Sequence, residues 1–353
     1  MKILVINPGS TSTKLGVYTD ERQEFVYVLR HSAEELVPFP TINDQFEFRK
    51  QLILRTLSEN GIPFLFDAII GRGGLLKPME SGVYEVNEAM RRDLLHAQRA
   101  HASNLGGLIA DALASSLSDC KAYIADPVVV DELADVARIT GLPQLPRVSI
   151  FHALNHKAIA RRYAHEQGKA YEDLDLIVCH MGGGISVAAH QRGRVIDVNN
   201  ALDGEGTFSP ERTGTLPVGQ LVDLCYSGQY THQEMRRLVC GRGGVYAHLG
   251  TTDMIQVERR AQSGDSHAQA VIDAMIYRTA KAVGGQSIVL HGHVDAILLT
   301  GGIVYSDYVR ERLTKYISFI APVHAYPGED ELQALADNAL AVLRGERTVK
   351  IYS

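Results

Sequence analysis

The chain has 353 residues, of which 45% are hydrophobic and 22% charged, and its formal net charge is −6. This length predicts about two domains, and the ordinary composition predicts a globular protein. The negative charge disfavours nucleic acid and anionic membranes as partners, and no stretch approaches the roughly 20 apolar residues of a membrane span. The four cysteines show no metal-site spacing, and no export signal is evident, so we expect reduced thiols and a cytoplasmic location.

The first stretch of the chain, residues 2–19, predicts two strands joined by a polar turn. Residues 3–6 form a short apolar run typical of a buried strand, and residues 15–18 predict a second strand. The turn between them carries the polar side chains of Asn7, Ser10, Thr11, Ser12, Thr13 and Lys14. Hydroxyls, backbone N–H groups and a lysine in a tight turn suit phosphate oxygens. The turn is therefore either a phosphate-binding loop or a plain polar hairpin.

Further along, the first half predicts alternating helices and strands. A helix is expected over 43–59, with Asn43 as its N-cap and Gly61 just past its end. A short buried strand, 67–70, leads into the glycine-rich residues 71–74. The remaining predicted elements of this half are a core helix over 103–117 and a strand over 122–125 that ends at Asp126.

A domain boundary is predicted at residues 141–148, where two prolines interrupt both periodicities. The second half predicts helices over 152–167, 265–283 and 329–343, strands over 174–179, 185–190 and 194–198, and a glycine-rich irregular segment over 199–217. The strand–turn–strand pattern of residues 2–19 recurs at 174–187. Residues 295–306 are predicted to form a strand, then a Gly-Gly turn and the start of a helix. This recurrence predicts two related halves that face one nucleotide. Neither a Walker A loop nor a G-x-G-x-x-G motif is present.

These motifs resemble those of the acetate and butyrate kinase family. Residues 7–14 resemble its N-x-G-S-[ST]-[ST]-x-K signature, residues 179–184 its second phosphate motif and residues 299–303 its adenosine motif. The stretches that resemble the butyrate kinase branch are 71–78, 85–90 and 101–106. The resemblance spans the whole chain in the same order.

The resemblance implies an α/β fold of two RNase H-like (actin-like ATPase) domains with a nucleotide cleft between them. The N-terminal domain would comprise residues 1–148 completed by 329–353, and the C-terminal domain residues 149–328. It also implies a transferase that uses ATP and Mg²⁺ to phosphorylate a short-chain carboxylate, butyrate first, giving an acyl phosphate and ADP. The transfer would be reversible, direct and in line, and the protein a homo-oligomer, a dimer or larger, with no nucleic-acid or membrane partner.

The alternatives are an acetate, propionate or branched-chain fatty acid kinase, and a nucleotide-driven binding protein of the actin and chaperone class. The length and the residues 71–78 disfavour an acetate or propionate kinase. The fold alone does not exclude a binding protein. Arginine and histidine side chains in glycine-rich turns, which transfer chemistry needs, disfavour it.

The resemblance assigns roles to individual residues. Arg72 would bind the substrate carboxylate and then the transferring phosphoryl group, with Asp126 positioning it. His180 would donate hydrogen bonds to phosphoryl oxygens without becoming phosphorylated, and Arg212 would be the second catalytic arginine. His152 matches a histidine near the interdomain hinge.

The remaining assignments concern the nucleotide and its metal. The phosphate-binding residues would be Asn7, Ser10, Thr11, Ser12, Lys14, Gly182, Gly183 and Gly184, and the adenosine-binding residues Gly301, Gly302 and Ile303. Asn7 and Glu331 would serve Mg²⁺, with Glu329 and Asp330 as alternatives to Glu331. Asp203 and Glu205 have either a water-mediated metal contact or an ordinary turn role, and Arg242 is predicted to be structural.

Since a carboxylic acid with a pKa of roughly 4–5 is already ionised at neutral pH, such a reaction needs no general base. It needs fixed cations that let an anion approach the γ-phosphate.

Overall fold

The computed structural model describes residues 1–97 and 101–353. The chain forms two compact units, which we call unit 1 (Met1–Val130 with Asp330–Ser353) and unit 2 (Asp131–Glu329). The predicted boundary stretch 141–148 lies inside unit 2, because Arg147 donates hydrogen bonds to Asp197 and to the Val198 carbonyl of that unit. The two prolines thus lie in a loop of unit 2, and the chain passes from unit 1 to unit 2 between Val130 and Asp131.

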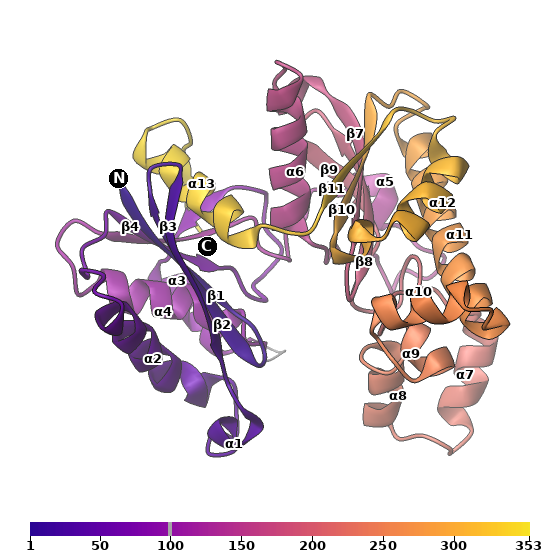
Figure 1. The fold of residues 1–353 in the computed structure, drawn as a ribbon, viewed down its shortest axis with the longest axis horizontal. Coiled ribbons are helices and arrows are strands. Elements are labelled where there is room, and N and C mark those ends of the chain that lie inside the picture. The colour runs from indigo at the N-terminus through magenta and orange to yellow at the C-terminus, as the bar shows by residue number, and fades with distance from the viewer. Residues whose placement is uncertain (98–100) are drawn as a thin grey trace. The chain divides into compact units, whose positions relative to one another are not determined.

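Unit 1 is built on a seven-stranded sheet with the order β12-β5-β6-β4-β1-β2-β3 (Figure 1). Its strands are β1 (Lys2–Pro8), β2 (Ser12–Thr19), β3 (Arg22–Arg30), β4 (Ala68–Arg72), β5 (Val83–Glu85), β6 (Lys121–Ala125) and β12 (Val349–Lys350). The first three form an antiparallel meander, and β1, β4 and β6 run parallel. The three parallel strands therefore end at the same edge of the sheet.

The helices of unit 1 are α1 (Ala33–Leu36), α2 (Phe46–Glu59), α3 (Glu88–Leu95), α4 (Asn104–Ala114) and α13 (Glu331–Leu343). Helices α4 and α13 lie against the sheet (Figure 1). Helix α4 packs on β4 and β6, and α2 packs on α4, whereas α13 contacts β1 and β4. The expected helix over 43–59 begins as a 3₁₀ turn, Asn43–Gln45, before α2. Asn43 is not the cap of α2, because its side chain donates to the Leu95 carbonyl instead.

The five-stranded sheet of unit 2, β11-β10-β7-β8-β9, repeats the order of the strands β6-β4-β1-β2-β3 in unit 1. Its strands are β7 (Asp175–Met181), β8 (Ile185–Gln191), β9 (Arg194–Val198), β10 (Ala296–Gly301) and β11 (Val323–Pro327). Strands β7, β8 and β9 form an antiparallel meander, and β10 and β11 are parallel to β7. The strand–turn–strand pattern that the sequence repeats is therefore the same structural element in both units.

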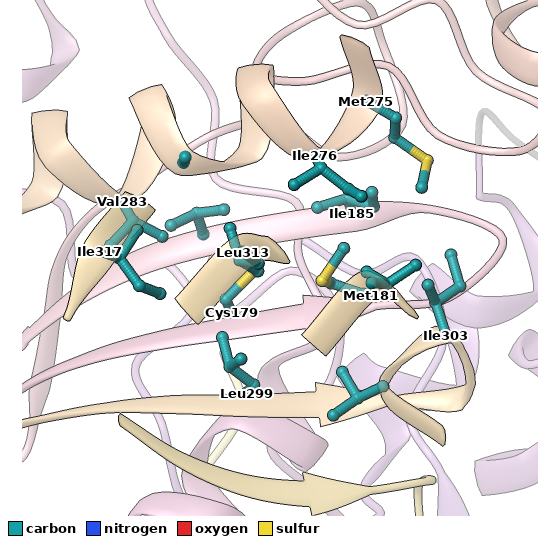
Figure 2. Packing of buried hydrophobic residues seen from close by; sticks show 14 of the residues in the cluster. Cys179, Met181, Ile185, Met275, Ile276, Val283, Leu299, Ile303, Leu313 and Ile317 are labelled. Carbon is teal, nitrogen blue, oxygen red and sulfur yellow. The ribbon is translucent and has the colours of Figure 1, made fainter. Parts of the chain in front are cut away.

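The helices of unit 2 are α5 (Asp135–Arg138), α6 (Ala153–Glu166), α7 (Val218–Tyr226), α8 (His232–Val239), α9 (Gly244–Leu249), α10 (Met254–Gln262), α11 (Ser266–Val289) and α12 (Asp307–Ile317). Figure 2 shows how α11 and α12 pack on one face of the sheet, with Met275, Ile276 and Leu313 against Cys179 and Met181 of β7. All five of these side chains are at most 1% exposed. The core thus fixes β7, whose C-terminal end carries His180. Within the described residues, no helix is long and apolar enough to cross a bilayer.

Candidate active site

In unit 1, three predicted site residues lie at adjacent strand ends. Ile6 pairs with Gly71 across β1 and β4, so Asn7 and Arg72 are the next residues on the two strands. Arg72 in turn pairs with Ala125 of β6, and Asp126 follows directly. Parallel strands bring their carboxyl ends to one edge, which is why residues far apart in the sequence meet here.

Glycine allows β4 to lie directly on the start of α4. A Cβ atom built on Gly71 would lie 2.1 Å from the Gly106 carbonyl oxygen, and one built on Gly106 would lie 2.3 Å from the Arg72 carbonyl oxygen. Side chains larger than hydrogen would push the two segments apart. The backbone of Arg72 is therefore held by contact with helix α4.

Arg72, Asn7 and Glu331 form one polar cluster in unit 1. The Arg72 guanidinium holds both carboxylate oxygens of Glu331, with Nη2 at 3.0 Å from Oε1 and Nη1 at 3.2 Å from Oε2. Asn7 donates to the same Oε2 at 2.7 Å. Asn7 is 4% exposed, and the side chains of Arg72 and Glu331 are 25% and 13% exposed. The guanidinium fork thus binds a carboxylate at a partly open position.

The acidic residues around the start of α13 have different partners. Asp330 caps α13 by accepting from the Gln333 N–H at 3.1 Å. Glu329 belongs to unit 2, where Oε2 lies 3.6 Å from His180 Nε2. Glu331 contacts Asn7 and Arg72, as described above, so it is the acidic residue whose geometry fits the predicted metal role.

The donor set around Glu331 suits a magnesium ion that is carried by phosphates. Mg²⁺ usually binds one or two carboxylates together with substrate phosphates and water. Glu331 offers one carboxylate, and the Asn7 amide oxygen remains available because the Nδ2 atom makes the contact with Glu331. In the described part of the chain, no group of three or more His, Cys, Asp or Glu side chains is arranged to hold a metal alone.

Asp126 is buried, with 1% exposure, and holds the segment that precedes β5. Its Oδ1 accepts from Ser81 Oγ at 2.6 Å and from the Gly82 N–H at 2.8 Å. Its backbone has a φ of +39°, which is uncommon for a residue other than glycine. The structure therefore places Asp126 at the same sheet edge as Arg72, while the carboxylate bound by the Arg72 fork is that of Glu331.

The predicted phosphate loop joins β1 to β2. The Gly9 N–H closes the turn by donating to the Ser12 carbonyl at 2.7 Å. The side chains of Ser10, Thr11 and Lys14 are exposed. Lys14 lies directly opposite Asn7 in the ladder, and directly opposed residues share one face of a sheet. The Lys14 ammonium and the Asn7 amide are thus on the same face.

In unit 2, His180 lies near the end of β7 and is 1% exposed. Its Nδ1 lies 2.8 Å from Asn155 Oδ1 of α6, and its ring stacks on His152 with 3.8 Å between the centroids. If Nδ1–H donates to Asn155, then Nε2 can donate to a ligand only when the ring is protonated. The Glu329 carboxylate lies 3.6 Å from that Nε2 atom.

Behind His180 and His152 runs a chain of buried side chains with polar groups that the sequence patterns did not identify, namely Ser186, His156, His190 and Tyr171. Ser186 Oγ lies 2.9 Å from His152 Nδ1 and 2.8 Å from His156 Nε2. His156 Nδ1 then lies 3.3 Å from His190 Nε2, and His190 Nδ1 lies 2.6 Å from the Tyr171 hydroxyl. Burial holds the pKa values of His156 and His190 well below the ordinary value, so both rings are neutral at pH 7. His156 lies four residues after His152 on α6, and His190 lies on β8, so no local sequence motif reveals the two residues.

The glycine turn 182–184 is packed against Arg212. The Gly182 N–H donates to the Gly184 carbonyl at 2.9 Å, and Ser209 Oγ donates to the Gly183 carbonyl at 2.6 Å. A Cβ atom on Gly184 would lie 2.1 Å from Arg212 Nη1, so only glycine allows the guanidinium to lie there. Arg212 Nη1 donates to the Ala201 carbonyl at 2.7 Å, while its buried Nε has no hydrogen-bond partner within the described chain.

The predicted adenosine motif lies at the end of β10, which pairs with β7 so that Thr300 is opposite His180. Gly301 has a φ of +96°, and a Cβ atom there would lie 2.4 Å from the Met181 carbonyl oxygen. Its N–H and carbonyl both bond to Gly328. Gly302 has nothing within 4 Å of its Cβ position, and Ile303 is 7% exposed in the unit 2 core. The backbone at Gly302 therefore has open space on the side where a side chain would lie.

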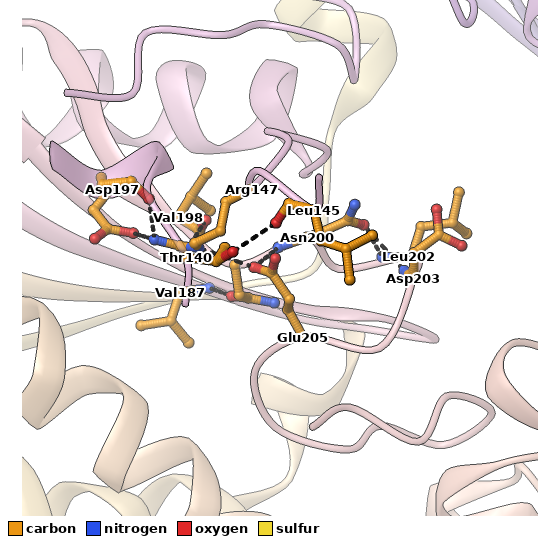
Figure 3. A network of polar contacts seen from close by, with 12 residues as sticks. Thr140, Leu145, Arg147, Val187, Asp197, Val198, Asn200, Leu202, Asp203 and Glu205 are labelled. Carbon is orange, nitrogen blue, oxygen red and sulfur yellow. Dashed lines mark hydrogen bonds and ion pairs between the residues drawn. The ribbon is translucent and has the colours of Figure 1, made fainter. Parts of the chain in front are cut away.

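Arg147 holds the start of the segment over 199–217, as Figure 3 shows. Its guanidinium contacts Asp197 Oδ1 at 2.9 Å and Glu205 Oε2 at 3.4 Å, and the same Glu205 oxygen accepts from the Asn200 N–H at 3.0 Å. Asp203 pairs with Arg236 at 2.8 Å. Of the two roles open for Asp203 and Glu205, the structure favours the turn role.

The duplicated sheet, with glycine turns at the strand ends, is the architecture of the actin-like ATPase fold. The solved structure of Porphyromonas gingivalis acetate kinase matches this chain with a TM-score of 0.79 at 20% identity, covering 97% of this chain and 99% of that one. A propionate kinase from Francisella tularensis matches with a TM-score of 0.73 at 18% identity, over 96% and 98% of the two chains. The predicted fold class is confirmed.

Sequence similarity identifies the family. The model of the "Acetokinase family" matches residues 146–324. A protein of Bacteroides thetaiotaomicron named "Probable butyrate kinase" is 63% identical over 352 residues and covers 100% of both chains. "Butyrate kinase 1" of Clostridium acetobutylicum is 54% identical over 353 residues and covers 99% of each chain. The chain belongs to the acetokinase family, which confirms the resemblance found in its motifs.

Proposed function

We propose that this protein transfers the γ-phosphoryl group of ATP to butyrate, giving butyryl phosphate and ADP, in a reversible reaction. The observation that carries the proposal is the full-length identity of 63% to a protein named as a butyrate kinase. The cations at the strand ends of each unit support it. A protein that only bound nucleotide would have no use for a carboxylate-binding fork beside its phosphate loop.

Unit 1 would supply the carboxylate site. The Arg72 fork already binds two carboxylate oxygens, those of Glu331. A substrate carboxylate presents the same two oxygens and would replace Glu331 at the fork. The planar guanidinium suits this exchange because it makes two parallel charge-assisted hydrogen bonds. Arg72 would then also bind the phosphoryl group as it is transferred to the carboxylate.

The same unit would hold the phosphates and the metal. The exposed hydroxyls of Ser10 and Thr11 and the Lys14 ammonium are donors for phosphate oxygens. Glu331, once released from Arg72, and the Asn7 amide oxygen would hold Mg²⁺. When bound, the ion would neutralise charge on the phosphates of ATP.

Unit 2 would stabilise the transferring group. His180, held by Asn155 and facing Glu329, would donate from Nε2 to a phosphoryl oxygen. Arg212 would add a second cation beside the turn 182–184. Adenosine would bind at Gly301, Gly302 and Ile303. Since the carboxylate nucleophile is ionised without help, direct in-line transfer needs only these fixed charges and no phosphohistidine.

We further propose that the protein is a cytoplasmic homo-oligomer. Its four cysteines are free thiols, as expected in a reducing compartment. Helix α7 exposes Val218, Val222 and Tyr226, at 71%, 48% and 88%, on positions four apart. A second copy of the chain is the partner that would cover this face. Light scattering on the purified protein and on Val222→Glu tests this, because a monomeric wild-type protein would refute it.

The function is tested by trapping the acyl phosphate with hydroxylamine while ADP is measured independently. We expect hydroxamate and ADP in equal amounts with butyrate. Comparing kcat/KM for acetate, propionate, butyrate, isobutyrate and valerate tests the chain-length assignment. ATP hydrolysis without hydroxamate for any of the five acids would refute carboxylate phosphorylation, and a higher kcat/KM for acetate or propionate would refute butyrate as the preferred substrate.

A further inference from the structure

Arg49 of α2 is a fully buried arginine, at 0% exposure, whose side chain lies behind the predicted phosphate loop. Its Nη1 donates to the Gly9 carbonyl at 2.9 Å and to the Ser12 carbonyl at 3.1 Å, and Nη2 donates to the Ser10 carbonyl at 3.1 Å. The inner side of the loop is therefore held by one guanidinium that reaches three of its carbonyl groups.

The remaining hydrogen bonds of Arg49 go to neutral side chains. Nη1 donates to Thr13 Oγ1 at 3.0 Å, and Nε and Nη2 donate to Gln45 Oε1 at 3.1 and 2.8 Å. Thr13 also contacts His31 Nε2 at 3.0 Å, and burial together with the Arg49 charge lowers the pKa of His31 to about 4, so that this ring is neutral. The charge on this side of the loop therefore belongs to Arg49.

This buried cation has no carboxylate partner among the residues that the structure describes. Burial lowers the pKa of Arg49 to about 10, which still leaves the guanidinium charged at pH 7. A buried charge is normally paired with an opposite charge, because desolvation is otherwise unfavourable. A loop that receives phosphate would supply the missing negative charge on its outer side.

The carbonyl contacts also determine where the loop N–H groups point. In a trans peptide the N–H of each residue is antiparallel to the preceding carbonyl, and the described chain has no cis peptide. Because the Gly9 and Ser10 carbonyls point inward to Arg49, the N–H groups of Ser10 and Thr11 point outward. Within the described chain neither N–H donates to another group. Two consecutive free N–H groups form the kind of concave donor site that binds anions.

We propose that Arg49 is a positioning residue for nucleotide phosphates, which sets the orientation of the Ser10 and Thr11 N–H groups from behind the loop and adds a buried positive charge. This inference rests on the proposed function, since it names the residue that organises the phosphate site. Arg49 itself contacts no substrate.

The test uses three variants of the full chain. Arg49→Met removes the charge and the donors, and Arg49→Lys keeps the charge but offers only one donor group. The matched control is Ile53→Ala, one turn further along α2, which opens a cavity in the same buried helix without touching the loop. For each protein, calorimetry measures the dissociation constants of ATP, ADP and adenosine, and thermal unfolding measures stability.

We expect Arg49→Met to weaken ATP and ADP binding by about ten- to a hundredfold, which is the effect of losing a hydrogen bond to a charged group. Adenosine binding should be unchanged. Arg49→Lys should fall in between. Ile53→Ala should lower the unfolding temperature yet leave all three affinities at wild-type values. If Arg49→Met does not fold, Arg49→Lys decides the question.

Unchanged ATP and ADP affinity in a folded Arg49 variant would overturn the inference, as would an equal loss of adenosine affinity. Equal losses in Ile53→Ala would also overturn it, because they would reduce Arg49 to a stabilising residue. The proposed function is judged separately by the wild-type protein: hydroxamate formation without an Arg49 effect would reject only the inference, whereas no hydroxamate with any acid would reject the function.

Discussion

Replacing Arg72 is the sharpest test of the carboxylate site. Its guanidinium makes two contacts with Glu331, at 3.0 and 3.2 Å, and the substrate carboxylate would use the same two donors. Arg72→Ala removes both donors. Arg72→Lys keeps the charge but cannot form the two-pronged contact, so we expect it to recover little activity.

The expected magnitude follows from the fork. Loss of one preorganised donor to a developing charge lowers kcat by about 100- to 1,000-fold, or roughly 3–4 kcal/mol. Arg72→Ala should therefore lower kcat/KM for butyrate at least that much. Thermal unfolding must show that the variant is folded, because removing Arg72 takes the counter-charge from the Glu331 side chain, which is 13% exposed.

The assay is steady-state hydroxamate formation with butyrate and ATP varied independently. Arg91→Ala is a suitable control, since Arg91 pairs with Asp111 at 3.0 Å in the same unit but on α3 and α4, away from the strand ends. We expect the control to keep the wild-type kcat/KM. The Arg72 variants should keep the wild-type affinity for adenosine.

Near-normal kcat/KM in either Arg72 variant would remove this residue from the site. An equal loss of activity in Arg91→Ala would also refute the reasoning, because it would mean that losing any ion pair of unit 1 disturbs the reaction.

Three further outcomes are expected. His180→Ala should lower kcat strongly with nearly unchanged ATP affinity, because the hydrogen bond from His180 to the phosphoryl group strengthens in the transition state. His180→Gln should keep part of the activity, because an amide can still donate a hydrogen bond. A phosphohistidine trapped at this position would exclude direct transfer. Lys157→Met should lower the free energy of unfolding by about 3–5 kcal/mol in chemical denaturation, since it removes one partner of the buried ion pair that Lys157 forms with Glu132 at 2.7 Å. No loss would show that the pair is not structural. The free energy of unfolding should fall as the pH drops below about 6.5, because the pKa of His31 is about 4 in the folded protein and the pKa values of His156 and His190 are also lowered, so the unfolded chain binds protons first. His31 alone accounts for about 3 kcal/mol of this loss. A constant free energy of unfolding from pH 7 to 4.5 would contradict this prediction.

Local sequence patterns were sufficient to predict the strands β1, β2, β7, β8 and β9 and the helices α2, α4, α6, α11 and α13, whereas α7 to α10 and α12 were not predicted. Apolar runs predicted β1 and β7, and the glycine just after a helix predicted where α2 ends, with Gly61 at a φ value of +65°. These features depend on residues a few positions apart, where backbone conformation and side-chain periodicity act directly. The motifs at 7–14 and 179–184 are also continuous in the sequence, which is why the family could be inferred before the fold was known.

Tertiary structure alone decided which of these residues act together within a unit. Asn7 and Arg72 meet Glu331 across 324 and 259 residues of sequence, because three parallel strand ends and the start of α13 converge at one edge of the unit 1 sheet. No periodicity in the sequence reports such a convergence. The role of Arg49 was equally hidden: a lone arginine in a helix is usually solvated, and only the packing of α2 shows that it is buried against the carbonyls of a loop 37 to 40 residues earlier.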